Sequence, residues 1–374
     1  MIIDDSIIRS EERAVFSLRS LYRQYGYSRF KMSRFEEYDL YVANKDFLIS
    51  DEVITFTDKS GRLLAMKPDV TLSIIKNAPD ISGEVQKVYY NENVYRVSGG
   101  THSFREIMQT GLECIGDLSD YEIAEVVLLA AQSLSAISED FILDISHMGL
   151  ISSVLENCSL SKKDSSKVLQ CLRNKNAHEL ALLCGTLNID EENTNKLNSL
   201  VCCAGAPEKV VSALKEHLTE ENEKAALEEL FSLCRLLEEQ GFDGRINIDL
   251  SVGNDLKYYS GVVFKGYVNG IPAGILSGGQ YDKLLKKMGR KSKAIGFAVY
   301  TDLLTRLENT DICPIIENVI LRGENADVYE LARFIKALPE NEKFLVTASL
   351  PEGKRWKRLY KAENGMVNLI EENC

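Results

Sequence analysis

The sequence predicts an α+β protein that carries a long helical insertion and a small C-terminal α/β unit. Residues 86–116 have the pattern of two strands joined by a loop around Gly99-Gly100. Residues 150–240 follow a helical pattern throughout, and strand patterns return between residues 245 and 282. We therefore expect a first domain over residues 1–312, interrupted by an insertion at about 150–240, and a second over 313–374.

Before the central hairpin, three local patterns predict structure. Ser10–Tyr25 is an amphipathic helix with acidic residues in its first turn, and Gly26 ends it. Residues 54–65 form a second hairpin, because the turn at 58–61 holds Asp, Ser and Gly. The sequence MKPDVT follows, and its proline can open a helix.

After the central hairpin, the expected elements are a helix, four strands and a helix entered through a Gly-Phe-Ala turn, at Tyr121–Ile137, Phe141–His147, Arg245–Val252, Leu256–Phe264, Ile275–Asp282 and Ala294–Leu307. In Leu256–Phe264 the adjacent Tyr258 and Tyr259 are expected on opposite faces. The tail is predicted as strand, helix, strand, helix and strand, after a linker at residues 308–314.

The second strand of the central hairpin has an unusual face. Its alternation puts Gln109, Gly111 and Glu113 side by side, so two polar side chains border a position without one. A glycine inside a strand often marks the close approach of a ligand or of another backbone. A bulge or a packing notch explains it equally well.

In MKPDVT, Asp69 and Thr71 lie in the first turn of the predicted helix. Unpaired N–H groups and short polar side chains in such a turn can bind a small ligand. Taken alone, however, the pattern favours an ordinary helix start.

Composition narrows the possible functions. The 374 residues are 45% hydrophobic and 27% charged, as in ordinary globular proteins, and the net charge is -12. This charge argues against broad binding to nucleic acid or anionic membranes. Lys354–Lys361 is a candidate basic groove, but a solvated amphipathic turn is the favoured interpretation.

Metal, cofactor and membrane functions are not expected. The nine cysteines form no CxxC pair, and the four histidines have no H-x-x-H spacing. No apolar run reaches the length of a membrane span, and no signal peptide is recognisable, so a cytoplasmic protein is expected. We expect no cofactor and no metal.

Taken together and in order, these segments resemble the histidyl-tRNA synthetase branch of the class II aminoacyl-tRNA synthetases. The resemblance covers nearly the whole of the first 310 residues, except that the helical insertion matches only in position. Tyr25-Gly26-Tyr27 resembles the dimer-forming motif 1, Tyr95-Arg96 with FREIMQTGLECIG resembles motif 2, and LKYYSGVVF resembles the histidine-specific strand. SGGQYDKLL followed by AIGFAVYTDLL is similar to the approach to motif 3. The resemblance implies an antiparallel sheet flanked by helices.

The departures from the family concern its nucleotide site. Ser98 stands where an acidic residue reads adenine, and Ser103 stands near the arginine that grips the γ-phosphate. Asp302 is followed by Leu303 instead of the motif 3 arginine, and the histidine-branch catalytic arginine falls at Asn254. One missing preorganised donor costs about 10²–10³ in rate, so losing three cations should abolish adenylation. We therefore expect no catalytic residue.

The amino-acid side of the pocket is retained by comparison. The resemblance implies a histidine site in which two residues take the ammonium, two meet the carboxylate and three meet the imidazole: Asp69 and Thr71, Arg96 and Gln109, and Glu113, Tyr258 and Tyr259. A pocket that binds histidine without activating it resembles the regulatory subunits of ATP phosphoribosyltransferases.

That resemblance implies a non-catalytic partner of a short-form catalytic subunit in the first step of histidine biosynthesis. It implies a homodimer within a hetero-octamer, with L-histidine as the feedback effector. Two alternatives stay open: a histidyl-tRNA synthetase, and a stand-alone binding protein with another amino acid or partner. The acidic charge balance suits the regulatory subunit better than tRNA binding.

Overall fold

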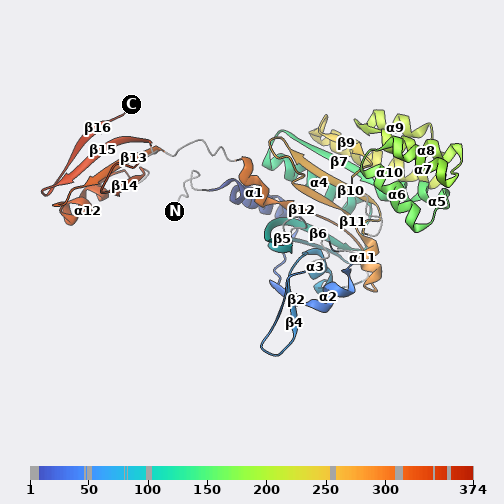
Figure 1. The fold of residues 1–374 in the computed structure, drawn as a ribbon, viewed down its shortest axis with the longest axis horizontal. Coiled ribbons are helices and arrows are strands. Elements are labelled where there is room, and N and C mark those ends of the chain that lie inside the picture. Colours follow the sequence, from blue (N-terminus) through green and yellow to red (C-terminus); the bar gives the residue numbers. More distant parts are fainter. Residues whose placement is uncertain are drawn as a thin grey trace. The chain divides into compact units, whose positions relative to one another are not determined.

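The computed structural model describes residues 8–45, 48, 53–79, 81, 83–97, 103–252, 258–307, 315–339, 342–351 and 355–373. The chain divides into two compact units, Met1–Leu307 and Glu308–Cys374 (Figure 1). The predicted linker at 308–314, the hairpin loop at 98–102 and Asn254 lie outside the described residues.

A nine-stranded sheet forms the centre of the first unit, in the order β1-β5-β6-β12-β11-β10-β7-β9-β8. Consecutive neighbours from β5 to β7 pair antiparallel, which confirms the predicted fold. The strands are β1 (Ser28–Arg29), β5 (Val85–Val97), β6 (Phe104–Gly116), β7 (Phe141–His147), β8 (Ala204–Gly205), β9 (Ile246–Asp249), β10 (Val262–Val268), β11 (Leu276–Gln280) and β12 (Lys293–Tyr300).

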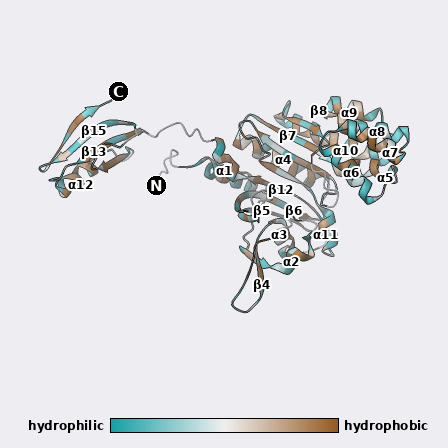
Figure 2. Ribbon diagram, in the orientation of Figure 1, coloured by the Kyte–Doolittle hydropathy of each residue, from teal (hydrophilic) through white to brown (hydrophobic). Residues whose placement is uncertain are grey.

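The two faces of the sheet bury separate cores, and β6 shows the division. Its residues Leu112 and Cys114 belong to the core that contains α1 (Ser10–Gln24) and α4 (Asp120–Ile137). Ile115 belongs to a second core with α3 (Thr71–Asn77) and α11 (Asp282–Lys287). The alternation predicted for this strand is therefore confirmed. Figure 2 shows the hydropathy of these elements.

A small three-stranded sheet adjoins the second core. It has the order β2-β4-β3, with β2 (Phe35–Glu37), β3 (Thr55–Thr57) and β4 (Leu63–Met66), beside α2 (Tyr38–Ala43). Asp58 holds the predicted β3–β4 turn, since its Oδ1 accepts the Ser60 and Arg62 N–H groups at 2.8 and 2.9 Å.

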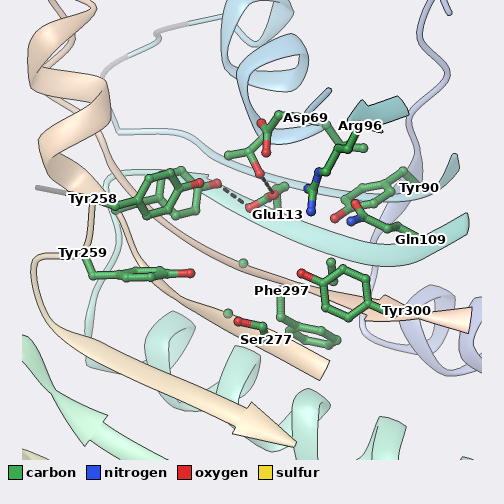
Figure 3. A pocket seen from close by; sticks show the side chains of 16 residues that line it. Asp69, Tyr90, Arg96, Gln109, Glu113, Tyr258, Tyr259, Ser277, Phe297 and Tyr300 are labelled. Atoms are coloured by element: carbon green, nitrogen blue, oxygen red, sulfur yellow. Dashed lines mark hydrogen bonds between the residues drawn. The ribbon is translucent and has the colours of Figure 1, made fainter. Parts of the chain in front are cut away.

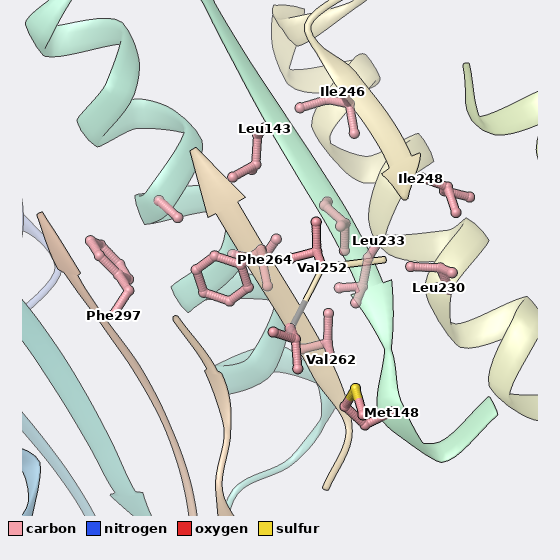
Figure 4. Close-up of a cluster of buried hydrophobic side chains, with 14 of the residues drawn as sticks. Leu143, Met148, Leu230, Leu233, Ile246, Ile248, Val252, Val262, Phe264 and Phe297 are labelled. Carbon is pink, nitrogen blue, oxygen red and sulfur yellow. The ribbon is translucent and has the colours of Figure 1, made fainter. Parts of the chain in front are cut away.

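The insertion is helical, as predicted, except for the two-residue strand β8. It consists of α5 (Met148–Asn157), α6 (Lys162–Arg173), α7 (Ala177–Leu187), α8 (Glu191–Cys202), α9 (Pro207–Lys215), α10 (Glu221–Leu237) and a last turn at Glu238–Phe242. Leu230 and Leu233 of α10 lie in the same hydrophobic core as Ile246 and Ile248 of β9 (Figure 4). The insertion thereby shares its core with the main sheet.

Two predictions in the first unit are wrong. The predicted strand Leu256–Phe264 begins at Val262, and Tyr258 and Tyr259 precede it without strand structure. The Gly-Phe-Ala segment is no turn but the middle of β12, which ends at Tyr300. A 3₁₀ helix, Thr301–Leu307, follows.

The second unit is a four-stranded sheet with one helix. Its order is β14-β13-β15-β16, with β13 (Ile315–Arg322), β14 (Phe344–Thr347), β15 (Arg355–Glu363) and β16 (Met366–Glu372). The helix α12 (Val328–Ala337) packs Phe334 against Tyr360, with ring centroids 4.8 Å apart. The amphipathic turn favoured for 354–361 is wrong, because residues 355–361 belong to β15, which pairs with β13 and β16.

Candidate functional site

All seven residues predicted from the sequence line a single cavity (Figure 3). They are joined there by nine others, and the complete lining is Asp69, Val70, Thr71, Tyr90, Arg96, Gln109, Glu113, Tyr258, Tyr259, Ser277, Gly278, Tyr281, Gly296, Phe297, Ala298 and Tyr300. The residues come from α3, β5, β6, β11 and β12 and from the segments before α3, before β10 and after β11. Their role toward a ligand stays a prediction.

Strand register fixes the floor of this pocket. Glu113 of β6 lies opposite Gly296 of β12, and Gln109 lies opposite Tyr300. Since the two β6 residues are four positions apart, both side chains leave the same face of the sheet. The Glu113 carboxyl group and the Gln109 amide therefore lie along β6 on the same face of the sheet.

The glycines of the floor make room for larger groups. A Cβ at Gly111 would overlap the Phe297 carbonyl oxygen and lie 2.6 Å from the Tyr90 hydroxyl, so both the close approach of another backbone and a packing notch describe this residue. A Cβ at Gly296 would overlap the Glu113 carboxylate. The space that Glu113 occupies thus depends on a missing side chain in the neighbouring strand.

Glu113 is a buried carboxyl group held by two hydroxyls. Its Oε1 accepts a hydrogen bond from Thr71 Oγ1 at 2.7 Å, and its Oε2 accepts one from the Tyr281 hydroxyl. The residue is 2% exposed. Burial raises the pKa of Glu113 to about 8, against the opposing effect of the two hydroxyls, and the nearby Asp69 raises it further.

Asp69 lies one residue before the N-cap of α3 and bonds to the first turn of this helix, which carries Thr71. Its Oδ1 accepts the Leu72 N–H at 2.9 Å, which satisfies one of the free donors at the start of α3. Burial raises the pKa of Asp69, while the Leu72 N–H and the positive charge of Arg96 act in the opposite direction. Asp69 therefore serves both as part of an ordinary helix start and as part of the pocket wall.

Arg96 is the only Lys or Arg among the described residues that line the pocket. Its Nε donates to the Pro68 carbonyl at 3.1 Å, which anchors the guanidinium beside the start of α3. Among the described residues, Arg96 is therefore the one fixed cation that faces the carboxyl groups of Asp69 and Glu113, and the hydrogen bonds to both carboxyl groups come from uncharged donors. Such a lining suits a ligand that carries a cation of its own.

A cluster of tyrosines closes one side of the pocket. The rings of Tyr258 and Tyr259 meet edge to face with centroids 4.7 Å apart, and those of Tyr258 and Tyr281 lie 5.9 Å apart. The expectation that Tyr258 and Tyr259 point to opposite faces is wrong, because the segment before β10 is not a strand. Both tyrosines line the cavity.

Sequence reasoning missed several lining residues. Tyr281 follows β11, in the segment SGGQYDKLL that resembles the approach to motif 3, and the sequence of this segment predicts no ligand contact for it. Tyr90 and Tyr300 lie in β5 and β12, where they look like ordinary strand residues. Period-2 alternation could have placed Tyr300 on a face, but not opposite Gln109, because that needs the register of two strands.

Neither a metal site nor a membrane-spanning helix is found in the described residues. No group of three or more His, Cys, Asp or Glu side chains there could hold a metal ion. None of the helices described is long and apolar enough to cross a membrane.

Comparisons with known proteins agree on one family. A family model described as histidyl-tRNA synthetase matches residues 4–304. A relative from Caldanaerobacter subterraneus subsp. tengcongensis, named ATP phosphoribosyltransferase regulatory subunit, is 32% identical over 286 residues, which are 75% of this chain and 74% of the relative. A relative of the same name from Oceanobacillus iheyensis is 28% identical over 302 residues, which are 80% of this chain and 74% of the relative.

Solved structures show the same fold at lower identity. A Bacillus halodurans protein described as an ATP phosphoribosyltransferase regulatory subunit/histidyl-tRNA synthetase has a TM-score of 0.73 and 23% identity, covering 97% of both chains. A chain from an ATP phosphoribosyl transferase complex of Thermotoga maritima has a TM-score of 0.61 and 24% identity, covering 80% of this chain and 98% of its own.

Proposed function

Because the chain belongs to the histidyl-tRNA synthetase family and, within it, to the group of ATP phosphoribosyltransferase regulatory subunits, we propose that it regulates that transferase in response to histidine. The observation that carries the proposal is the lining of the pocket: the carboxyl groups of Asp69 and Glu113 and five tyrosines surround one guanidinium, that of Arg96. This lining can pair with an amino acid, but it offers a triphosphate little positive charge.

The ligand of this pocket is L-histidine. Its ammonium pairs with Asp69 beside Thr71, and its carboxylate meets Arg96 and Gln109. The imidazole meets the buried end of the pocket. There it faces Glu113, Tyr258 and Tyr259, together with Tyr281. A ligand without a polar ring would leave the Glu113 carboxyl buried beside an apolar group, which opposes its binding.

The chain itself does not activate histidine. Synthetase chemistry needs fixed cations around the phosphates of ATP. Leu303 follows Asp302 at the start of the 3₁₀ helix after β12, where the family carries an arginine. Ser103 stands near the place of a second arginine. These uncharged replacements support a protein that has kept the amino-acid site and lost the nucleotide site.

Regulation occurs through assembly with a short-form catalytic subunit. Two copies of this chain pair through the α1 region and join catalytic subunits in a hetero-octamer. Histidine acts as a feedback effector only if it binds two states of that complex with different affinity. The synthetase-like domain, residues 1–312, holds the effector, and residues 313–374 form a separate domain.

The test combines this chain with a short-form catalytic subunit that is inactive alone. We expect phosphoribosyl transfer to ATP to appear on mixing and to be inhibited by histidine. Asp69→Asn should weaken that inhibition at least tenfold, since it removes the charge opposite the ammonium. Asp117→Asn, at an exposed position outside the pocket lining, is the matched control. Robust ATP–pyrophosphate exchange with histidine would instead identify a synthetase.

A further inference from the structure

Glu113 is surrounded by groups that cannot supply it with a positive charge. Thr71 approaches it from α3, Asp69 from the segment before α3, Tyr281 from the segment after β11 and Tyr258 from the segment before β10. Tyr90 faces it from β5, and β12 contributes Gly296, which has no side chain. Burial raises the pKa values of these tyrosines, so they remain neutral hydroxyls at ordinary pH.

The charges in the complex of the pocket with histidine then balance only if Glu113 and the ligand imidazole share one proton. The ligand ammonium neutralises Asp69, and the ligand carboxylate neutralises Arg96. Glu113 and the imidazole are left facing each other in a buried site. With no proton between them the pair would carry an uncompensated negative charge, and two protons would leave an uncompensated positive one.

We propose that Glu113 enters the complex carrying a proton and shares it with the ligand's imidazole, so that histidine affinity is constant across neutral pH and falls on both sides. The inference rests on the proposed histidine site. It concerns whether the Glu113–imidazole pair holds a proton in the complex, and knowing that the ligand is histidine does not decide this. The proton comes from Glu113 at neutral pH, and from solvent when Glu113 is ionised.

The pH limits follow from the two free partners. Below the imidazole pKa of about 6.5 the free ligand carries an extra proton that must be released on binding, so affinity falls as pH falls. Above the Glu113 pKa of about 8 the empty pocket has lost its proton and must take one up, so affinity falls as pH rises. A carboxyl of ordinary pKa would move the constant range to acidic pH.

Isothermal calorimetry of the full chain with L-histidine, in buffers of different ionisation enthalpy, measures the proton uptake. At pH 7.0 we expect a net release of only about 0.15 proton, because the imidazole releases about 0.24 and Glu113 takes up about 0.09. At pH 8.5 the wild type should take up about 0.75 proton more than Glu113→Gln, and its affinity should fall about fourfold further between these pH values. The ligand's amino group also begins to titrate there. Glu113→Gln retains that contribution, so the difference between the proteins isolates Glu113.

Two further variants sharpen the outcome. Tyr281→Phe removes a hydrogen bond that lowers the Glu113 pKa, so the alkaline fall in affinity should move to higher pH. This variant decides the question if Glu113→Gln binds histidine too weakly to measure.

Glu106→Gln is the control, because Glu106 is exposed and lies on the opposite face of β6, and it should match the wild type. Equal proton uptake at pH 8.5 by wild type and Glu113→Gln overturns the inference and leaves the proposed function standing. No binding by the wild type overturns both the site and the inference.

Discussion

Glu113 shows how a single side chain depends on a neighbour that has none. In an extended strand any residue could occupy position 296, yet a Cβ there would overlap the Glu113 carboxylate and lie 2.5 Å from the Leu112 carbonyl oxygen. The backbone of a paired strand cannot yield easily, so the carboxyl group would have to move. Its hydrogen bonds with Thr71 and Tyr281 would then be lost.

Gly296→Ala should therefore abolish histidine binding and destabilise the fold. We expect a loss of about 1–3 kcal/mol in the free energy of unfolding, as for other overpacked sites. Chemical denaturation measures it, with calorimetry for binding. Gly185→Ala is the control, since its Cβ meets open space within α7; it should bind normally and gain about 0.5–1 kcal/mol. Normal binding by Gly296→Ala would contradict the proposed placement of the imidazole.

At the scale of elements, prediction succeeded where the pattern was local. The β5–β6 hairpin was found because its alternation and its glycine pair lie within one stretch of sequence. The strand at residues 355–361 was not predicted, because basic and aromatic residues fall on both faces of the segment. Neither the helix period of 3.6 nor the strand period of 2 is therefore clear in the sequence of these residues. Pairing with β13, some 40 residues earlier, decides that they form a strand.

The same reason explains which site residues were found. Asp69, Gln109 and Glu113 lie in segments whose motifs are visible in sequence. The Tyr281 hydroxyl meets Glu113 across 168 positions of chain. Only the strand order of the sheet brings these two residues together, and no local pattern encodes it.

The connection from β4 to α3 depends on a buried ion pair. Lys67 is fully buried, and its Nζ lies 2.9 Å from Glu92 Oε2 in β5. Burial lowers the Lys67 pKa, and Glu92 opposes that shift. The Lys67 carbonyl also accepts the Tyr95 N–H at 2.8 Å. The ion pair thus holds the segment that carries Pro68 and Asp69 against the strand that carries Arg96.

Lys67→Ala should lower the free energy of unfolding by about 3 kcal/mol, because it leaves the Glu92 carboxylate without its partner. Histidine affinity should fall as well, since Asp69 lies two residues further on. Lys76→Ala breaks the more exposed pair with Glu36 and should cost less than about 1 kcal/mol. Urea denaturation of both variants measures the difference, and equal costs would show that the buried pair stabilises no more than a surface one.

At the scale of the whole molecule, the pocket belongs to one unit alone. Its lining runs from Asp69 to Tyr300, inside Met1–Leu307, and the family match over residues 4–304 falls in the same unit. The second unit buries a much smaller core, centred on Ile320, Leu331 and Ala362. Effector binding and the C-terminal unit should therefore be separable.

A chain ending at Leu307 should bind histidine with the affinity of the full chain, because every lining residue and both cores of the first unit remain. Calorimetry on the two chains at neutral pH tests this, with circular dichroism to establish that the shorter one is folded. Mixing each chain with the catalytic subunit then shows whether activation needs the second unit. A folded short chain that binds histidine more than tenfold more weakly would mean that residues 308–374 complete the site.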